Sequence, residues 1–501
     1  MCEQPHYLFV LVAASAVGKS ELINKLKSES LWKNISKYST RDNRGVNDDV
    51  VKITDPATVE KEIKYPNNVR HIRMEYIQRI CGNGKGVVYY KNSNIYGINI
   101  DEIINGLTIS NLVVVISDFH VIHELRKDDR LRYRIKILYI ASTVDERELL
   151  KRFKSRESID FSEQSTKTLK TINNIEKMCS VLSSAARLKY LSKIEEVLPL
   201  LNEQWNNYLP YFDTIKTRSL NIRMLYNRYI DNIAYIDYAI LNFYDLEYMF
   251  KQVRSIINNL SCRRQVKSPP VFMVCSAVSS GKGTLMEIIG DLGTVNNNIS
   301  ITTKYAKRDK RATDVRDGMF AIGKSGDFGT YISDRKDVWS WTFHINSTEY
   351  AVNHADIRRN INDGKAQIFI SNMEQIAEAK KTYPDNIVVL YLHATHASAT
   401  KEHIIAKRKD EYIKICHQKL IENSSSDQTE ESIKYYFDNN QKIRTEFTES
   451  IEADLREIET VHHRFLLYNH LIDHVLLNTG TREDLVEQMT NLINYYGKPI
   501  S

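Results

Sequence analysis

The sequence has few of the features that mark secreted, membrane or disordered proteins. Its six cysteines are scattered over 501 residues without a C-x-x-C pair, which argues against a disulfide framework or a zinc site. No apolar run approaches the ~20 residues that cross a bilayer. Glycine and proline are scarce, at 18 and 9 residues, so long disordered linkers are not expected. These absences predict a cytoplasmic protein with reduced thiols and no membrane association.

The sequence also lacks a strong charge of one sign. Its formal net charge is +6, which suits anionic small ligands and does not call for nucleic acid as a partner. Apolar residues make up 42% and charged residues 26%, an ordinary globular composition. A chain of 501 residues is long enough for two or three domains, each with its own core.

The first candidate functional stretch is residues 13–20, Ala-Ala-Ser-Ala-Val-Gly-Lys-Ser, between an apolar run and a helical pattern. In this order of strand, turn and helix, Gly-Lys-Ser predicts a phosphate-binding loop whose backbone N–H groups surround phosphate oxygens. Lys19 would reach the terminal phosphates of ATP and Ser20 would hold Mg²⁺. The usual pattern begins with glycine where this chain has Ala13. A tight turn with an exposed lysine is the alternative.

A second strand, loop and helix follows in the C-terminal half, with residues 276–284 reading Ser-Ala-Val-Ser-Ser-Gly-Lys-Gly-Thr. Residues 37–44 (KYSTRDNR) and 304–311 (KYAKRDKR) match, and four further pairs follow in the same order along the two halves. Such ordered matches predict a tandem repeat that arose by duplication. The expected domains are 1–262 and 263–501.

The fold class expected from this pattern is α/β, with two tandem P-loop domains whose parallel sheets are covered by helices. Each half also carries a long polar helical insertion, at about 163–232 and 411–469, which could contact a protein partner. Besides the strand before each loop, we expect strands at 113–116, 136–140, 238–241, 367–370, 387–392 and 474–477.

These motifs resemble the guanylate kinase family of P-loop nucleoside monophosphate kinases, over most of both halves apart from the insertions. In that family a T-T-R-x-x-R segment grips the acceptor monophosphate, and residues 39–44 and 306–311 resemble it. Two guanidinium groups three residues apart could indeed hold a phosphate dianion. A solvated basic turn is the alternative. The corresponding arginines are Arg41 and Arg44 in the first half and Arg308 and Arg311 in the second.

Other family positions are matched better in the first half. The family's Tyr-Gly resembles Tyr96-Gly97 and, less closely, Tyr350-Ala351, and its acidic residue after the central strand resembles Asp118, with Asn372 as the counterpart. The family's lid pattern resembles residues 149–156, where Arg152 and Arg156 would close on the transferring phosphoryl group. The second half has only a basic run around Arg408.

The resemblance implies Mg²⁺-dependent phosphoryl transfer from ATP to a nucleoside monophosphate acceptor, with GMP or dGMP favoured, mainly in the first domain. One alternative is a phosphosugar kinase of the ribose 1,5-bisphosphate type, to which residues 350–371 are also similar. Another is a degenerate guanylate kinase-like module that binds nucleotide or protein. The candidate catalytic residues are Lys19, Arg41, Arg44, Asp118, Arg152 and Arg156. The candidate ATP-binding residues are Ala13, Ala14, Ser15, Ala16, Val17, Gly18, Lys19, Ser20, Ser276, Ser280, Gly281, Lys282, Gly283, Thr284, Arg308 and Arg311, with Ser20 and Thr284 also candidate Mg²⁺ ligands.

Overall fold

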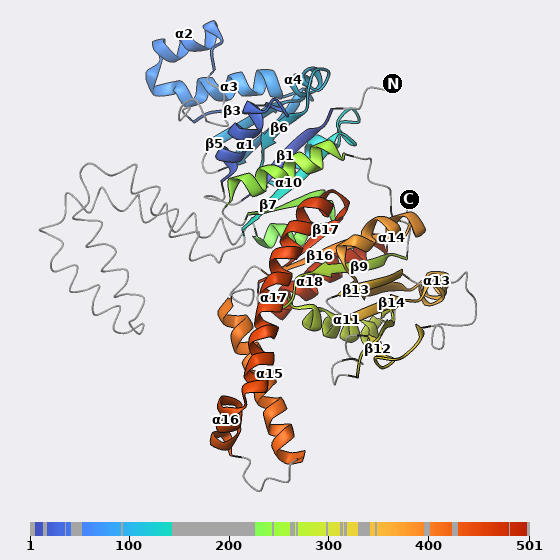
Figure 1. Cartoon of the computed structure of the whole chain (residues 1–501). Coiled ribbons are helices and arrows are strands. Elements are labelled where there is room, and N and C mark those ends of the chain that lie inside the picture. Colours follow the sequence, from blue (N-terminus) through green and yellow to red (C-terminus); the bar gives the residue numbers. More distant parts are fainter. Residues whose placement is uncertain are drawn as a thin grey trace, which may run out of the picture.

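The computed structural model forms two α/β units, each built on a five-stranded parallel sheet (Figure 1). It describes residues 6–13, 18–35, 37–41, 53–91, 94–142, 226–242, 245–260, 266, 269–296, 299–310, 314, 318–328, 341–345, 348–394, 401–422, 429–479 and 481–497. We call the part from β1 to α10 the first unit and the part from β9 to α18 the second unit.

The main sheet of the first unit has the strand order β2-β6-β1-β7-β8, and all its pairings are parallel. A smaller antiparallel sheet, β3-β5-β4, lies with two helices at the far end of the unit. The strands are β1 (Leu8–Ala13), β2 (Lys33–Asn34), β3 (Tyr38–Ser39), β4 (Gly86–Lys91), β5 (Asn94–Asn99), β6 (Leu112–Val115), β7 (Ile135–Ser142) and β8 (Tyr238–Asn242). The helices are α1 (Lys19–Ser28), α2 (Pro56–Lys64), η1 (Pro66–Asn68), α3 (Val69–Cys81), α4 (Ile100–Gly106), α5 (Phe119–Arg126), η3 (Ile233–Tyr235) and α10 (Leu246–Asn258).

The second unit repeats this order as β10-β15-β9-β16-β17, again entirely parallel. Its smaller sheet is β12-β11-β14-β13. The strands are β9 (Val271–Ser276), β10 (Ile299–Ile301), β11 (Lys304–Ala306), β12 (Met319–Ala321), β13 (Trp341–Ile345), β14 (Thr348–Val352), β15 (Ala366–Ile370), β16 (Ile387–Ala394) and β17 (His474–Asn478). The helices are α11 (Lys282–Asn296), α13 (His354–Asn362), η4 (Met373–Gln375), α14 (Ile376–Thr382), α15 (Lys401–Glu422), α16 (Glu430–Asn439), α17 (Gln441–Tyr468), η6 (Asn469–Leu471) and α18 (Arg482–Tyr496).

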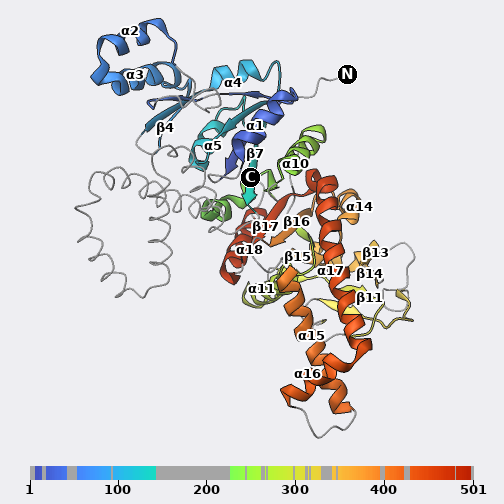
Figure 2. The ribbon, with the colours of Figure 1, turned by 60° about the vertical axis from the view of Figure 1, so that its left-hand side comes forward.

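The structure confirms the α/β class and every strand expected from the sequence. These strands are buried on both faces, which is why they read as short runs of Val, Ile and Leu. The second insertion is helical as expected, although it starts at Lys401, and α15 and α17 form an arm that extends away from the sheets (Figures 1 and 2). The first insertion lies outside the described residues except for a final helical stretch, 226–232. None of the described helices is long and apolar enough to cross a membrane.

In each unit a glutamine side chain forms hydrogen bonds with the backbone of the last strand of the main sheet. Gln252 of α10 accepts a hydrogen bond from the N–H of Leu241 at 2.8 Å and donates one to its carbonyl at 2.7 Å. Gln488 of α18 makes the same pair of bonds with Leu477, both at 2.9 Å. All four residues are buried, so each glutamine satisfies backbone groups that have no access to water.

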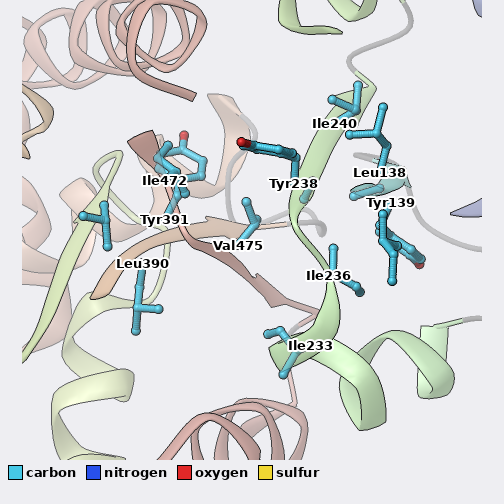
Figure 3. Packing of buried hydrophobic residues seen from close by; sticks show 14 of the residues in the cluster. Leu138, Tyr139, Ile233, Ile236, Tyr238, Ile240, Leu390, Tyr391, Ile472 and Val475 are labelled. Carbon is cyan, nitrogen blue, oxygen red and sulfur yellow. The ribbon is translucent and has the colours of Figure 1, made fainter. Parts of the chain in front are cut away.

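The edge strands β8 and β17 bring the units together around one continuous apolar core. Ile233, Ile236 and Tyr238 of the first unit and Ile472 and Val475 of the second belong to this core, and Figure 3 shows them around the two edge strands. The contacts are reciprocal, because η6 packs on α10 while η3 packs on α18. An interface to which both partners contribute the same elements is typical of two-fold symmetry.

Candidate phosphate-binding sites

The first loop, residues 13–20, connects β1 to α1 at the carboxyl edge of the sheet. Gly18 precedes the helix with φ of 81°, a left-handed conformation that favours glycine. The Lys19 ammonium turns back and donates to the carbonyl of Ala13 at 3.1 Å. Ser20 is exposed in the first turn of α1. The remaining predicted residues of this loop, Ala14, Ser15, Ala16 and Val17, lie outside the described residues.

The second loop, residues 276–284, shows the same geometry in full. Gly281 has φ of 100°, and the Lys282 ammonium donates to the carbonyls of Ala277 at 2.8 Å and Ser276 at 3.4 Å. The Ser280 hydroxyl also donates to Ala277, at 2.8 Å. Gly283 and Thr284 follow in the first turn of α11, and Thr284 is exposed. Each loop therefore holds a lysine ammonium against its own carbonyls at a helix N-terminus, where it could neutralise a bound phosphate.

Several buried polar atoms near the second loop lack a hydrogen-bond partner within the described part of the chain. They are the side-chain oxygens of Ser276, Ser279, Ser371 and Asn372, at or just beyond the carboxyl ends of β9 and β15. An unsatisfied buried donor or acceptor costs about 1–3 kcal/mol. In an open parallel sheet, ligands bind at this edge. Oxygen donors of this kind fit a hydrated Mg²⁺ or a phosphate, so these atoms are compatible with the predicted ATP and Mg²⁺.

The predicted acceptor arginines occupy different surroundings in the two units. Arg41 follows β3 at the edge of the smaller sheet, and its N–H donates to the Ser39 hydroxyl at 3.1 Å. Arg308 is almost fully buried and donates to both carboxylate oxygens of Asp314, at 3.0 and 2.5 Å. Burial lowers the pKa of Arg308, but the hydrogen bond with Asp314 and its charge outweigh this, so the net shift of the pKa is upward. The other two predicted arginines, Arg44 and Arg311, lie outside the described residues.

Asp118 lies beyond the end of β6, which is the neighbour of the central strand β1 and not the central strand that the sequence predicted. It caps α5 by accepting a hydrogen bond from the N–H of His120 at 3.0 Å. The sheet register changes its expected counterpart. Val115 lies opposite Leu11, and Ile370 lies opposite Val274, which occupies the place of Leu11 in the second unit. Counting on from these pairs places Asn372 level with Ser117 rather than with Asp118. The residue level with Asp118 is therefore Met373, so the second unit has no carboxylate at this place.

The predicted lid residues of the first unit, Arg152 and Arg156, lie outside the described residues. In the second unit Arg408 lies within α15 and binds both carboxylate oxygens of Asp454 on α17, each at 2.6 Å. It also donates to Glu411 at 2.7 Å. Arg408 thus joins two helices of the arm.

Two arginines that the sequence analysis did not single out reach the carboxyl edges of the main sheets. Arg228, in the helical stretch 226–232, donates to the carbonyl of Ser117 at 3.3 Å. Arg464, near the end of α17, forms an ion pair with Glu374 at 2.6 Å. Each arginine lies eight residues before the isoleucine of the Ile-Asp pair that directly precedes the last strand of its unit. Extending the repeat alignment back from that pair would have found them.

Both matched octets begin with lysine. Lys37 and Lys304 are buried, at 6% and 4% exposure. The Lys37 ammonium lies 5.7 Å from the ring centre of Tyr96, and that of Lys304 lies 4.8 Å from the ring centre of Tyr350. These cation–π contacts join neighbouring strands of the smaller sheet in each unit. In the first unit the Lys37 ammonium also donates to the carbonyl of Val115 in β6 at 2.7 Å, which links the smaller sheet to the main sheet.

No family model matches this sequence, and no curated protein matches it. Among solved structures, the chain is similar to guanylate kinase from Anaplasma phagocytophilum. The identity is 13%, the TM-score is 0.24, and the match covers 46% of this chain and 87% of that chain. Similarity at this level does not indicate an activity for this chain. The activity proposed below is therefore based on the site alone.

Proposed function

We propose that this chain is a P-loop phosphotransferase that moves the γ-phosphoryl group of ATP, with Mg²⁺, to a nucleoside monophosphate. The observation that carries the proposal is the repeated loop geometry. In both units a glycine at positive φ precedes a helix whose first lysine turns its ammonium back onto the loop carbonyls. Twice in one chain, this arrangement stands at the carboxyl end of the central strand of a parallel sheet. It is the place and the chemistry that phosphate binding requires.

We assign the transfer reaction to the first unit. There Lys19 and the loop amides would bind the β- and γ-phosphates, Ser20 would hold Mg²⁺, and Arg41 with Arg44 would orient the acceptor. Arg152 and Arg156 would approach the transferring group, and Asp118 would orient the acceptor. When bound, Mg²⁺ would supply charge neutralisation across the phosphate oxygens. The protein contributes position and charge and forms no covalent intermediate.

For the second unit we propose nucleotide binding without transfer. Within the described residues, two of the arginines that a kinase would direct at phosphate are held by carboxylates, Arg308 by Asp314 and Arg408 by Asp454. Both carboxylates are buried, at 2% and 5% exposure. Breaking such a buried pair costs about 3–5 kcal/mol, which an incoming acceptor would have to supply. The second unit would therefore retain a loop for ATP without a competent acceptor site.

The first test separates the two loops with matched substitutions. Lys19→Ala should abolish phosphoryl transfer, because it removes the ammonium that would neutralise the β- and γ-phosphates. Lys282→Ala, at the corresponding position, should leave transfer by the first unit largely intact and remove one of two ATP sites. The measurements are ADP production with GMP, dGMP and ribose phosphates as acceptors, and ATP titration by calorimetry with Mg²⁺.

The outcomes discriminate between the proposals. Turnover of Lys19→Ala equal to that of the unmodified chain would reject transfer by the first unit. Transfer to ribose phosphates alone would favour the phosphosugar kinase. An unmodified chain that binds no ATP would reject phosphotransfer altogether and leave a protein-interaction module.

A further inference from the structure

We propose that Arg228 is a phosphate-binding residue of the first site, directed at the polyphosphate of a nucleoside triphosphate. This inference rests on the proposed function and adds a residue from outside the sequence motifs. Arg228 belongs to the helical stretch 226–232, which joins the first insertion to η3. It therefore enters the site from the last part of the first unit.

The position of Arg228 follows from the sheet. Its guanidinium donates to the carbonyl of Ser117, just beyond the end of β6. The Lys19 ammonium donates to the carbonyl of Ala13, the last residue of β1. Since β6 and β1 are parallel neighbours about 5 Å apart, both cations lie at the same edge of the sheet.

The bond that Arg228 makes is a weak one for a guanidinium. Its length of 3.3 Å exceeds the 2.7–2.9 Å typical of charge-assisted bonds, and its acceptor is a neutral carbonyl. Within the described residues, no carboxylate forms an ion pair with Arg228. A guanidinium held in this way can exchange the carbonyl for phosphate oxygens, which it can bind through two parallel bonds.

The second unit provides the comparison. Arg464 occupies the corresponding place, but its guanidinium is paired with Glu374 at 2.6 Å. A phosphate would have to displace that carboxylate. Arg228 therefore contacts a neutral carbonyl, whereas the charge of Arg464 is already balanced by Glu374.

Contacts with the second unit hold Arg228 in place. The hydroxyl of Tyr229, next in the chain, donates to the carbonyl of Val475 in β17, and the hydroxyl of Tyr226 donates to Leu477 at 3.4 Å. Tyr229 is 1% exposed. The helical stretch that presents Arg228 to the first site is therefore anchored on the edge strand of the other unit, which orients the side chain before any ligand arrives.

The test uses the full chain carrying Lys282→Ala, so that only the first loop binds ATP. In this background we compare Arg228→Gln, Arg228→Lys and Arg464→Gln by calorimetric titration with Mg²⁺ and ATP. Arg228→Gln should weaken ATP binding about tenfold or more, because it removes a charge-assisted contact. Arg228→Lys should recover part of the lost affinity, since it restores the charge without the two parallel N–H donors of the guanidinium. Arg464→Gln should leave ATP affinity unchanged.

The result that overturns the inference is an Arg228→Gln chain that binds ATP as tightly as its parent while Lys19→Ala does not bind. Equal losses in Arg228→Gln and Arg464→Gln, with matching drops in melting temperature, would also overturn it by showing a structural role. Failure of the parent itself to bind ATP would instead reject the proposed function.

Discussion

At the scale of single residues, the second unit has a buried histidine where the first unit has an alanine. His393 lies in β16 with 5% exposure, and burial lowers its pKa to about 3, with nearby His462 adding a smaller effect in the same direction. The aligned strand β7 carries the small, apolar Ala141 at this place. The second unit therefore contains an ionisable group that the fold keeps neutral.

This burial predicts acid sensitivity. The unfolded chain takes up a proton on His393 near pH 6.5, while the folded chain does so only near pH 3, so the contribution of His393 to stability is lost as the pH falls between these values. At pH 5 the free energy of unfolding should be lower than at pH 7.5 by about 2 kcal/mol from this group. Urea unfolding measures this change. The free energy of unfolding of His393→Ala should differ less between pH 5 and pH 7.5 than that of the unmodified chain.

The control for that experiment is His120→Ala, because the His120 side chain is 79% exposed. Its pH dependence should match that of the unmodified chain. If His393→Ala also keeps the full pH dependence, the acid sensitivity comes from other groups.

At the scale of elements, the end of β17 contacts the second candidate phosphate-binding loop, residues 276–284. Asn478 of β17 donates to the carbonyl of Ser280 at 2.9 Å. A Cβ at Gly281 would overlap the Asn478 amide nitrogen, and the φ of 100° would be strained for any other residue. Loop, strand and helix thus meet at one glycine.

Gly281→Ala should therefore destabilise the chain by about 1–3 kcal/mol and weaken ATP binding by the second loop. The matched control is Gly290→Ala in α11, where nothing lies within 4 Å of an added Cβ. That change should stabilise the helix by about 0.5–1 kcal/mol. Thermal unfolding monitored by circular dichroism measures both; a Gly281→Ala chain as stable as its parent would contradict the described contact.

The sequence predicted the elements far better than the contacts between side chains. Strands such as 113–116 and 474–477 are visible because burial on both faces imposes an apolar run. Arg308 looked like half of an acceptor grip, because local spacing cannot show that Asp314 turns back to bind it. Arg228 was missed because its target carbonyl, Ser117, lies far away in the sequence. The one-residue difference between the units after β6 and β15 became visible only through the sheet register.

At the scale of the whole molecule, the two units are joined by contacts that repeat in both directions. Tyr226 donates to Asp484 of α18 at 3.4 Å, and Tyr248 of α10 donates to the carbonyl of His462 at 2.7 Å. These two pairs occupy corresponding places in the two units. Because one apolar core runs through both units, the units should unfold together.

Calorimetry of the unmodified chain should accordingly show one main unfolding transition. Ile233→Asp places a charge in η3, at a position 1% exposed in the contact with α18, and should split this transition into two by separating the units. Ile109→Asp is the control, because Ile109 is 68% exposed and should tolerate the charge. Two transitions in the unmodified chain would show that the units unfold independently.

The reciprocal interface has a consequence for behaviour on dilution. Two separate subunits that met through such a surface would come apart as their concentration fell, and their melting temperature would depend on concentration. Here both halves of the surface belong to one chain, so their encounter is intramolecular. The anchoring of Arg228 on β17 would therefore hold equally well in a dilute assay and at high protein concentration.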